Sequence, residues 1–546
     1  MKTALVAFNA KYIHKNLALR WIYVSKPKEE DAEIFEFTIN DKIENTLHKV
    51  ETYQPDVIGI SVYIWNAEYV KEWIVKIREV LPNCRIVLGG PEVTYENDGW
   101  FDLPIDAILQ GEGEITFWQY VQYKENIDGL KTREYTSSIP YAKVPISYLE
   151  SLESPYFLEM DKKDMDRRYL YVETSRGCPY RCSYCLASLD NQVRMFSDDY
   201  LFALFDQLET SGVQQVKFLD RTFNVKPQRA LAIAKRLSQM PEGMSFQFEV
   251  VAETLSEELL SFFLNQTNKN RFRFEIGLQT FNDHALKEVG RIQNNEKLVS
   301  VIERMRDHQC IMHVDLIAGL PLEDYTSFKE TFRKLYSLHI DEMQVGILKF
   351  LKGTRMNAMK EEYQATHDEH SPYTIYENKW ITKEEIEIVD IVAHAVEKCW
   401  NSGKLRNTIQ YMTNSGWDAF ELFYEVGKQL IELGHPYQAW QLFDIFWKLS
   451  YQNHKMRGVL MMDYYALFKQ RPKRWLNMPF DEEVRKQIVD RMVEYGFVKE
   501  RLHRYAIFDY GYMDDVLYYQ CVVYNELQTL PDRYLISMDF ETVKEV

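Results

Sequence analysis

The sequence predicts an α/β chain of three parts: a doubly wound, Rossmann-like unit, a partial barrel of six strand–helix repeats, and a mainly helical C-terminal domain. Short apolar runs alternate with helical patterns over residues 1–135, and the same alternation returns from residue 169 to 349. From residue 366 the strand-like runs give way to amphipathic helical periodicity. A chain of 546 residues is also too long for a single core.

The first block has buried strands whose ends carry glycine. Its strands are predicted at Ala4–Phe8, Val57–Val62, Arg85–Leu88 and Ile105–Leu109. Gly89-Gly90 and the run Gly111-Glu112-Gly113-Glu114 follow the last two strands, where backbone must turn sharply or approach a ligand. The block lacks a Gly-x-Gly-x-x-Gly turn, so a dinucleotide is not expected. A flavodoxin-like docking domain without a ligand is the alternative interpretation.

Residues 136–168 are predicted to be a linker, because they lack periodicity and contain repeated prolines. The central block then covers residues 169–365, and the C-terminal domain covers 366–546. Six strands are predicted in the central block, at Tyr169–Thr174, Val216–Asp220, Phe246–Ala252, Phe272–Gly277, Met312–Ala318 and Glu342–Lys349. The intervening helices begin after Ser197, Pro227, Ser256 and Asp324, with another helical stretch running through Arg306. Eight such repeats close a barrel, so six predict an open, partial one.

Four amphipathic patterns predict helices in the last part of the chain. They are Lys383–Trp400, Ser415–Leu433, Pro436–Ser450 and Glu482–Tyr495. Tryptophan and tyrosine at helical spacing there are usually core, and some of them are expected to shape a substrate pocket.

Polar residues and glycines end the strands of the central block. They are Asp220–Asn224, Glu249 with Glu253, Gly277–Thr280, Asp315 with Gly319–Pro321, and Lys349–Thr354. A capping aspartate or a turn glycine is ordinary at any single strand end. Five such groups at one rim predict a ligand site, because ligands of these sheets lie at the carboxyl ends of the strands.

The most specific feature is a run of three cysteines, Cys178, Cys182 and Cys185, with three and then two residues between them. Iron–sulfur clusters are normally held by four cysteine thiolates, so three on one loop suggest a cubane with one open iron. Structural zinc is the alternative, but a closed zinc site needs a fourth cysteine or histidine. The nearest following histidine is His284, so the pattern favours the cluster.

This loop resembles the radical S-adenosylmethionine (radical SAM) superfamily, in which an aromatic residue, here Tyr184, precedes the last cysteine. The resemblance implies that Cys178, Cys182 and Cys185 bind three irons of a 4Fe-4S cluster, and that S-adenosylmethionine chelates the fourth. It also implies an enzyme that cleaves this cosubstrate reductively, with an electron donor such as flavodoxin or ferredoxin.

The same resemblance assigns positions to the cosubstrate. Gln279 and Arg291 fall where the superfamily contacts its ribose and carboxylate, and Gly319 lies where backbone passes the adenine. The family's Gly-Gly-Glu element, which holds the methionine amino group, is replaced here by a segment that ends in Asp220 and Arg221. Asp220 is the candidate for that contact. For Glu253 there are two interpretations, a contact to the ligand and a helix cap.

The first block resembles the cobalamin-binding domain of cobalamin-dependent radical SAM enzymes. By that resemblance Ser61 and the Gly89-Gly90 pair line the slot for the nucleotide tail. The Asp-x-His-x-x-Gly loop of many cobalamin proteins has its counterpart at His14, without the Asp or the Gly. We therefore expect no histidine ligand to cobalt from the protein, and expect His14 to be hydrogen-bonded or packed.

Taken together, the resemblances imply a cobalamin-dependent radical methyltransferase that acts on an unactivated carbon of a small-molecule or peptide substrate. A non-methylating radical rearrangement or oxidation is the first alternative, and a non-catalytic cobalamin or iron–sulfur sensor is the second.

Composition bears on the partners and the compartment. The net charge of −17 argues against a broad nucleic-acid surface. A local basic cluster, Arg167, Arg168, Arg176, Arg181 and Arg194, is interpreted as solvated or ion-paired rather than as an anion site. Seven cysteines without a disulfide pattern, and no long apolar run, predict a cytoplasmic protein without a membrane span.

Overall fold

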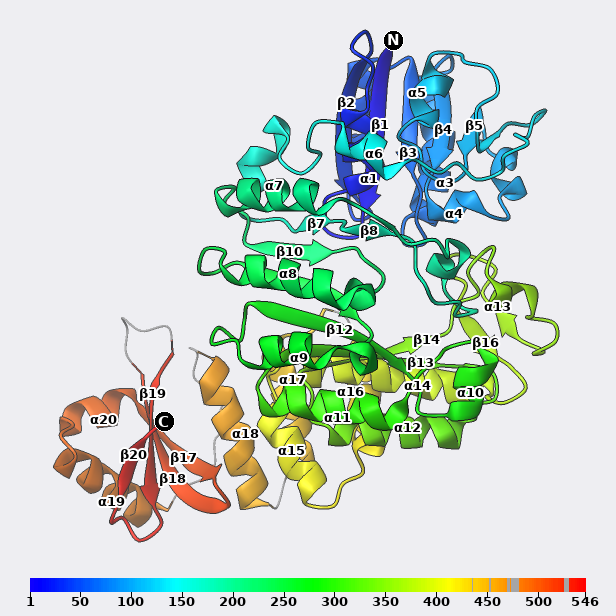
Figure 1. Cartoon of the computed structure of the whole chain (residues 1–546). Coiled ribbons are helices and arrows are strands. Elements are labelled where there is room, and N and C mark those ends of the chain that lie inside the picture. Colours follow the sequence, from blue (N-terminus) through cyan, green and yellow to red (C-terminus); the bar gives the residue numbers. More distant parts are fainter. Residues whose placement is uncertain (435, 451–452, 469–471, 473–480, 525–529) are drawn as a thin grey trace. The chain divides into compact units, whose positions relative to one another are not determined.

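The computed structural model describes residues 1–434, 436–450, 453–468, 472, 481–524 and 530–546. The chain forms two compact units (Figure 1). One unit contains Met1–Phe328 and Ile347–Ile386, and the other contains Lys329–Gly346 and Glu387–Val546. The α/β class is confirmed, while the domain boundaries at residues 135, 168 and 365 stay predictions.

The first sheet has the strand order β2-β1-β3-β4-β5-β6, in which β1 to β5 are parallel and β6 is antiparallel. The strands are β1 Lys2–Asn9, β2 Asp31–Thr38, β3 Val57–Ser61, β4 Arg85–Gly89, β5 Ala107–Leu109 and β6 Leu130–Lys131. Its helices are α1 Leu17–Val24, α2 Ile43–Tyr53, α3 Ala67–Val80, α4 Pro91–Thr94 and α5 Thr116–Val121, with the short helix η1 at Asp98–Asp102. This is the doubly wound order, whose switch point lies between β1 and β3.

Both faces of this sheet are buried, which explains the unbroken apolar run of β1. Ala4, Val6 and Phe8 pack into one hydrophobic cluster, and Leu5 and Ala7 pack into another on the opposite face. Successive side chains of a strand point to opposite faces, so a strand covered on both sides must be apolar throughout. Every strand predicted here is present, and β2 and β6 are additional strands that were not predicted.

The linker contains helix α6 (Ile146–Glu150) and the short helix η2 (Glu159–Asp164). The second sheet follows it, with the strand order β14-β13-β12-β11-β10-β7. Neighbouring strands from β7 to β13 pair in parallel. The strands are β7 Leu170–Val172, β10 Gln215–Phe218, β11 Ser245–Val250, β12 Phe272–Gln279, β13 Ile311–Ala318 and β14 Glu342–Ile347. All six predicted strands are therefore present, in the order of a partial barrel.

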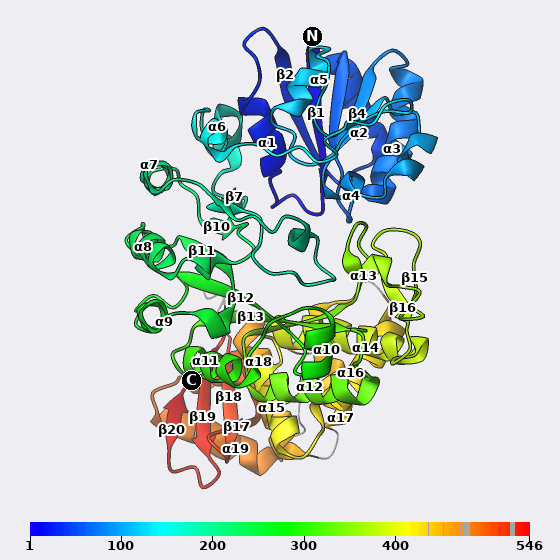
Figure 2. The ribbon, with the colours of Figure 1, turned by 45° about the vertical axis from the view of Figure 1, so that its right-hand side comes forward.

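The helices of this block are α7 Asp198–Glu209, α8 Pro227–Ser238, α9 Glu257–Leu264, α10 Asp283–Glu288, α11 Asn295–Asp307 and α12 Tyr325–Ser337. Figure 2 shows α7, α8 and α9 in a row on the outer side of β7, β10 and β11. The side chains of Ser197 and Ser256 cap α7 and α9, as the sequence predicts. Three single-turn 3-10 helices lie in the loops: η3 Leu186–Leu189, η4 Phe223–Val225 and η5 Ala252–Thr254.

After β14 come α13 (Arg355–Ala358) and the short hairpin β15 (Thr366–His367) with β16 (Ile375–Glu377). The helical prediction for the last part is confirmed. Its helices are α14 Lys383–Ala395, α15 Arg406–Asn414, α16 Ala419–Leu433, α17 Ala439–Leu449, α18 His454–Leu467, α19 Glu482–Glu494 and α20 Lys499–Tyr505, and a π-helix spans Val396–Asn401.

The end of the chain adds an antiparallel sheet that the sequence analysis did not predict. Its strands are β17 Ala506–Met513, β18 Val516–Val523, β19 Asp532–Ser537 and β20 Val543–Glu545. This sheet shares a hydrophobic cluster with α19 and α20. Among the residues that the structure describes, no helix combines the length and the apolarity needed to cross a bilayer.

Candidate functional site

A cavity of about 880 Å³ lies within the first unit, at the carboxyl ends of the strands of the first sheet. Residues after β1, β3, β4 and β5 line one side of it, which is where doubly wound sheets bind ligands. Residues of the cysteine loop, such as Gly177 and Ala187, line it as well, together with Tyr171 of β7 and Arg221. The cavity therefore extends from the predicted cobalamin slot to the cysteine loop, while the three cysteines themselves are not among the residues that line it.

The predicted slot residues lie on the wall formed by the first sheet. Ser61 is the last residue of β3, and its Oγ accepts a hydrogen bond from Asn16 Nδ2 at 2.9 Å. Gly90 has φ +111°, and a Cβ there would lie 2.5 Å from Val62 O, so glycine is required. At Gly89 a Cβ would meet only Leu109 O, at 3.8 Å. The bare backbone at Gly89 fits a slot that a bulky group can enter.

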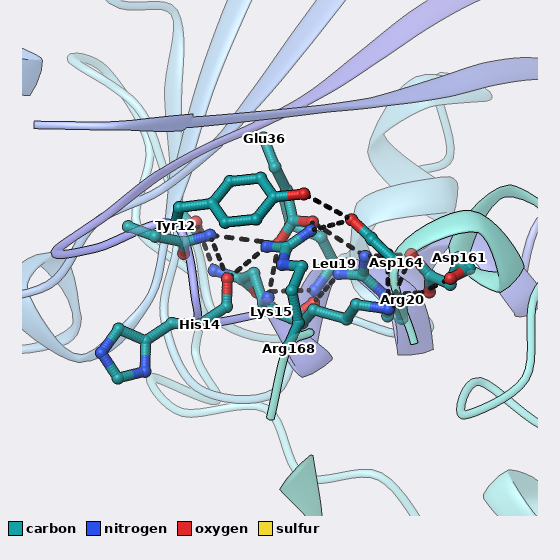
Figure 3. A network of polar contacts seen from close by, with 12 residues as sticks. Tyr12, His14, Lys15, Leu19, Arg20, Glu36, Asp161, Asp164 and Arg168 are labelled. Carbon is teal, nitrogen blue, oxygen red and sulfur yellow. Dashed lines mark hydrogen bonds and ion pairs between the residues drawn. The ribbon is translucent and has the colours of Figure 1, made fainter. Parts of the chain in front are cut away.

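His14 lies on the same wall and is hydrogen-bonded, as the sequence predicts. Its Nδ1 is 2.6 Å from the Tyr171 hydroxyl. Burial lowers the pKa of His14, and Lys217, Lys11 and Arg168 lower it further, so the imidazole is neutral at pH 7. Arg168 donates to the backbone carbonyl of His14, within the polar network shown in Figure 3.

The cysteine loop connects two short antiparallel strands, β8 (Ser175–Arg176) and β9 (Arg194–Met195). Cys178 and Cys182 are buried, and Cys185 is half-buried. The backbone N–H of Cys178 donates to Asp190 O at 2.9 Å, and that of Cys185 donates to Cys182 O at 3.1 Å. These bonds fold the loop back on itself.

Burial raises the pKa of Cys178 and of Cys185, and the neighbouring cysteines raise it further. The three cysteines therefore lie within electrostatic range of one another. In the described ranges, no group of three or more Cys, His, Asp or Glu side chains is arranged so as to hold a metal ion. Their role as cluster ligands stays a prediction.

Arg291 lies among the other residues predicted to contact the cosubstrate and interacts with several of them. Its Nη2 donates to Gly277 O, its Nε donates to Gln293 Oε1 at 2.9 Å, and its charge acts on the ionisation of Tyr184 and Glu253. Burial raises the pKa of Tyr184 and the pKa of Glu253.

Two side chains beside Arg291 have buried oxygens without a partner. Glu253, in η5, and Gln279, at the end of β12, are both more than nine-tenths buried. The Oε1 atom of each makes no hydrogen bond within the described part of the chain. Buried polar atoms are normally satisfied, so these two fit a polar ligand that the protein atoms do not supply.

Asp220 and Gly319 are placed at their predicted strand ends. Asp220 accepts hydrogen bonds from Thr174 N at 2.9 Å, Thr174 Oγ1 at 2.6 Å and Ser175 Oγ at 2.5 Å. Its carboxylate thus anchors the strand end that leads into the cysteine loop. Gly319 has φ +90°, and its carbonyl accepts from Asn378 Nδ2 at 2.9 Å. The ligand roles of both residues stay predictions.

Sequence reasoning missed a contact between helix α4 and the segment after β14. Lys352 Nζ lies 2.8 Å from Glu92 Oε1, and the Tyr373 hydroxyl donates to the same oxygen. Nearby, Glu96 accepts from Gly353 N at 2.8 Å and from Asn357 Nδ2 at 2.7 Å. Glu96 and Gly353 are 257 residues apart in the chain, so no local pattern could have indicated this contact.

The comparisons with known proteins agree with this layout. The model of the B12 binding domain matches residues 3–121, and that of the radical SAM superfamily matches residues 172–335. A model described as a protein of unknown function (DUF4080) matches residues 361–530.

The curated relatives are identical to this chain at about one aligned residue in four. An uncharacterized methyltransferase of Pyrococcus horikoshii is 25% identical over 357 residues, which are 62% of this chain and 77% of the relative. The cobalamin-dependent radical SAM methyltransferase TokK of Streptomyces tokunonensis is 25% identical over 305 residues, or 51% of this chain and 44% of TokK. The chain thus spans less than half the length of TokK.

Two solved structures share the fold. The cobalamin-dependent S-adenosylmethionine radical enzyme OxsB, with aqua-cobalamin bound, superposes with a TM-score of 0.62 at 16% identity, covering 87% of this chain and 82% of that one. The radical S-adenosylmethionine methyltransferase TsrM from Kitasatospora setae, with cobalamin and a [4Fe-4S] cluster bound, gives 0.54 at 15% identity over 68% and 79%.

Proposed function

Because the chain is a radical SAM enzyme that carries a B12-binding domain, we propose that it transfers a methyl group to an unactivated carbon of its substrate. The two domains make a 4Fe-4S cluster, S-adenosylmethionine and cobalamin its cofactors. When bound, these groups supply a radical that removes a hydrogen atom and a methyl group to be transferred. The protein binds and orients them and excludes water.

The observation that carries this proposal is the shared cavity. Ser61 and Gly89 at the carboxyl edge of the first sheet line the same space as Gly177 and Ala187 of the cysteine loop. A substrate carbon must be reached from both cofactor sites in one methylation. A chamber of about 880 Å³ that extends from the predicted cobalamin slot to the cysteine loop supports this proposal.

The side chains divide into three roles. Cys178, Cys182 and Cys185 would hold the cluster. Glu253, Gln279 and Arg291, with Tyr184 beside them, would position S-adenosylmethionine through the two unpaired buried oxygens and the guanidinium. Ser61 and the backbone at Gly89 and Gly90 would line the slot for cobalamin. Asp220 and Gly319 would complete the cosubstrate site at the neighbouring strand ends.

Methylation is preferred over other radical reactions because two of the relatives are themselves named methyltransferases. An anaerobic magnesium-protoporphyrin IX monomethyl ester cyclase of Rubrivivax gelatinosus is also similar, at 24% identity over 327 residues. A non-methylating reaction is therefore the second candidate. An electron donor such as flavodoxin or ferredoxin, and a small-molecule or peptide substrate, stay predictions.

The test is anaerobic reconstitution with iron, sulfide and hydroxocobalamin, followed by reduction in the presence of S-adenosylmethionine. We expect a brown cluster chromophore, corrinoid that stays with the protein through gel filtration, and both 5′-deoxyadenosine and S-adenosylhomocysteine as products. The Cys182→Ala variant should lose the chromophore and the 5′-deoxyadenosine while keeping its corrinoid. Release of 5′-deoxyadenosine without S-adenosylhomocysteine would overturn methylation in favour of the second candidate.

A further inference from the structure

The loop after β5 carries two carboxylates to which the proposed function assigns no role. Gly111 has φ +94°, and a Cβ there would lie 2.4 Å from the carbonyl oxygen of Ala142. Only glycine fits this position, and it lets the loop lie directly against the linker. The following residues, Glu112 and Glu114, are thereby held at the wall of the cavity.

Glu112 contacts both ends of the cysteine loop. Arg176 ends β8 and Arg194 begins β9, and the two are partners in the antiparallel pair. Arg194 Nη1 lies 3.1 Å from Glu112 Oε2, and its Nη2 donates to Oε1. Arg176 Nη1 lies 3.5 Å from the same Oε2. All three cysteines lie in the loop that these two arginines close.

The positive charges of Arg176 and Arg194 require negative charge nearby. Like charges directly opposite on neighbouring strands repel each other, and both side chains here are largely buried. Glu114 lies 2.8 Å from Arg176, and Asp190 lies 3.2 Å from Arg194. Glu112 pairs with both guanidinium groups, and it also accepts from the backbone N–H of Val144 at 2.6 Å. The carboxylate thus joins the linker to both strands of the hairpin.

We propose that Glu112, a residue of the B12-binding domain, is a positioning residue for the iron–sulfur cluster. It closes the base of the cysteine loop and sets the charge beside the cluster. The proposal rests on the proposed function, because it places the cluster on Cys178, Cys182 and Cys185. It explains why the loop after β5 pairs glycine with glutamate: the glycine brings the loop close, and the glutamate supplies the charge.

Because the effect of Glu112 is electrostatic, the proposal predicts the direction in which the reduction potential of the cluster shifts when this charge is removed. Removing the negative charge of Glu112 makes the net charge at the hairpin more positive by one unit, although Arg176 still pairs with Glu114 and Glu173, and Arg194 with Asp190. The reduction potential of an iron–sulfur cluster depends on the charge and hydrogen bonds around it, and positive charge favours the reduced, more negative cluster. Glu112→Gln should therefore raise the midpoint potential, and Arg194→Gln should lower it.

The experiment is a redox titration of the reconstituted full chain, followed by electron paramagnetic resonance, without substrate and without turnover. Glu112→Gln, Arg194→Gln and the double variant are compared with the wild type. We expect opposite shifts in the two single variants, and a midpoint close to the wild type in the double variant, because it restores the net charge. Glu112→Asp keeps the negative charge on a shorter side chain, so its midpoint potential should lie between those of Glu112→Gln and the wild type.

Glu72→Gln is the matched control, because it removes the same charge from the same domain, but its carboxylate is exposed on α3 and pairs with Lys76 rather than with the cysteine loop. Its midpoint should equal that of the wild type. The proposal is overturned if Glu112→Gln assembles a full cluster with an unchanged midpoint and spectrum, or if both single variants shift in the same direction. A wild-type chain that assembles no cluster would instead overturn the proposed function.

Discussion

Glu249 on β11 lies near several other acidic side chains of the partial barrel. Its partner in the parallel register is Glu275 on β12, so the two side chains share one face of the sheet. Burial raises the pKa of Glu249 to about 7; Arg221, 3.6 Å away, opposes this rise, and Glu275, Asp315 and Asp220 add to it. Like charges in register destabilise a sheet, so this arrangement costs stability once both carboxylates ionise.

The Glu249→Gln variant tests that cost. The folded pKa lies above the unfolded value of 4.5, so the folded state binds the extra proton between these values and the wild type loses stability as the pH rises from about 4.5 to about 7. A glutamine resembles the neutral carboxyl at every pH. We expect the melting temperatures of variant and wild type to agree at pH 5, and the variant to melt higher at pH 8.

Thermal unfolding followed by circular dichroism at the two pH values measures this difference. Glu303→Gln, at an exposed position on α11, makes the same chemical change and should show no such pH-dependent gap. A Glu249→Gln variant that melts lower than the wild type at pH 8 would contradict the argument.

At the scale of elements, a buried ionic network joins the loop after β1, helix α1, strand β2 and the short helix η2 of the linker (Figure 3). Asp161 binds Arg20 through two hydrogen bonds of 2.7 Å, and Arg20 also pairs with Glu36 at 2.8 Å. Burial would raise the pKa of Glu36, but Arg20 and Arg168 outweigh it and lower the pKa to about 2. Glu36 therefore stabilises the fold above pH 4.5, and this contribution is lost as the pH falls toward 2.

Asp161→Asn removes one of the two carboxylates that pair with the buried Arg20 and leaves Glu36 as its remaining partner. Hydrogen bonds to charged groups contribute about 1.5–3 kcal/mol. We expect a loss of that size in the free energy of unfolding of the first unit, measured by urea titration. Asp166→Asn, in the same linker, disturbs only a pair with Arg167 that is exposed and 3.8 Å long, and should cost less than about 1 kcal/mol. Equal losses in the two variants would show that the network does not brace the linker.

These elements also show which features the sequence could predict. β1 and β3 were predicted because strands buried on both faces leave a continuous apolar run, whereas β2 is half-exposed and mixes three acidic residues with its apolar ones. The cysteine loop could be identified because its three cysteines are neighbours in the chain. The sheet of β17 to β20 was not predicted, since its strands carry polar and aromatic residues as the neighbouring helices do.

Contacts between distant segments left no signal in the sequence. Glu112 and Arg194 are 82 residues apart, and Arg20 and Asp161 are 141 apart. The basic cluster was interpreted as solvated or ion-paired, and Arg168, Arg176 and Arg194 are indeed ion-paired. Which carboxylates pair with them depends on how the linker folds back, and that is a property of the tertiary structure.

At the scale of the whole molecule, the chain divides into two compact units. One unit contains the B12-binding domain, the cysteine loop and the cavity, and the other contains most of the region matched by the model of unknown function. Compact units of one chain commonly unfold in separate transitions. Calorimetry of the full chain should therefore resolve two transitions.

Hydroxocobalamin should raise the melting temperature of only one of these transitions, because the candidate slot lies wholly within the first unit. A ligand that binds only the folded state stabilises it by about 2.7 kcal/mol at a hundred times its Kd. Gly89→Leu is the control: the backbone there has an ordinary φ, and the added side chain would enter the slot, so the unliganded transitions should persist while the cobalamin-dependent shift disappears. A shift that survives in Gly89→Leu, or one that moves both transitions equally, would place the corrinoid elsewhere on the chain.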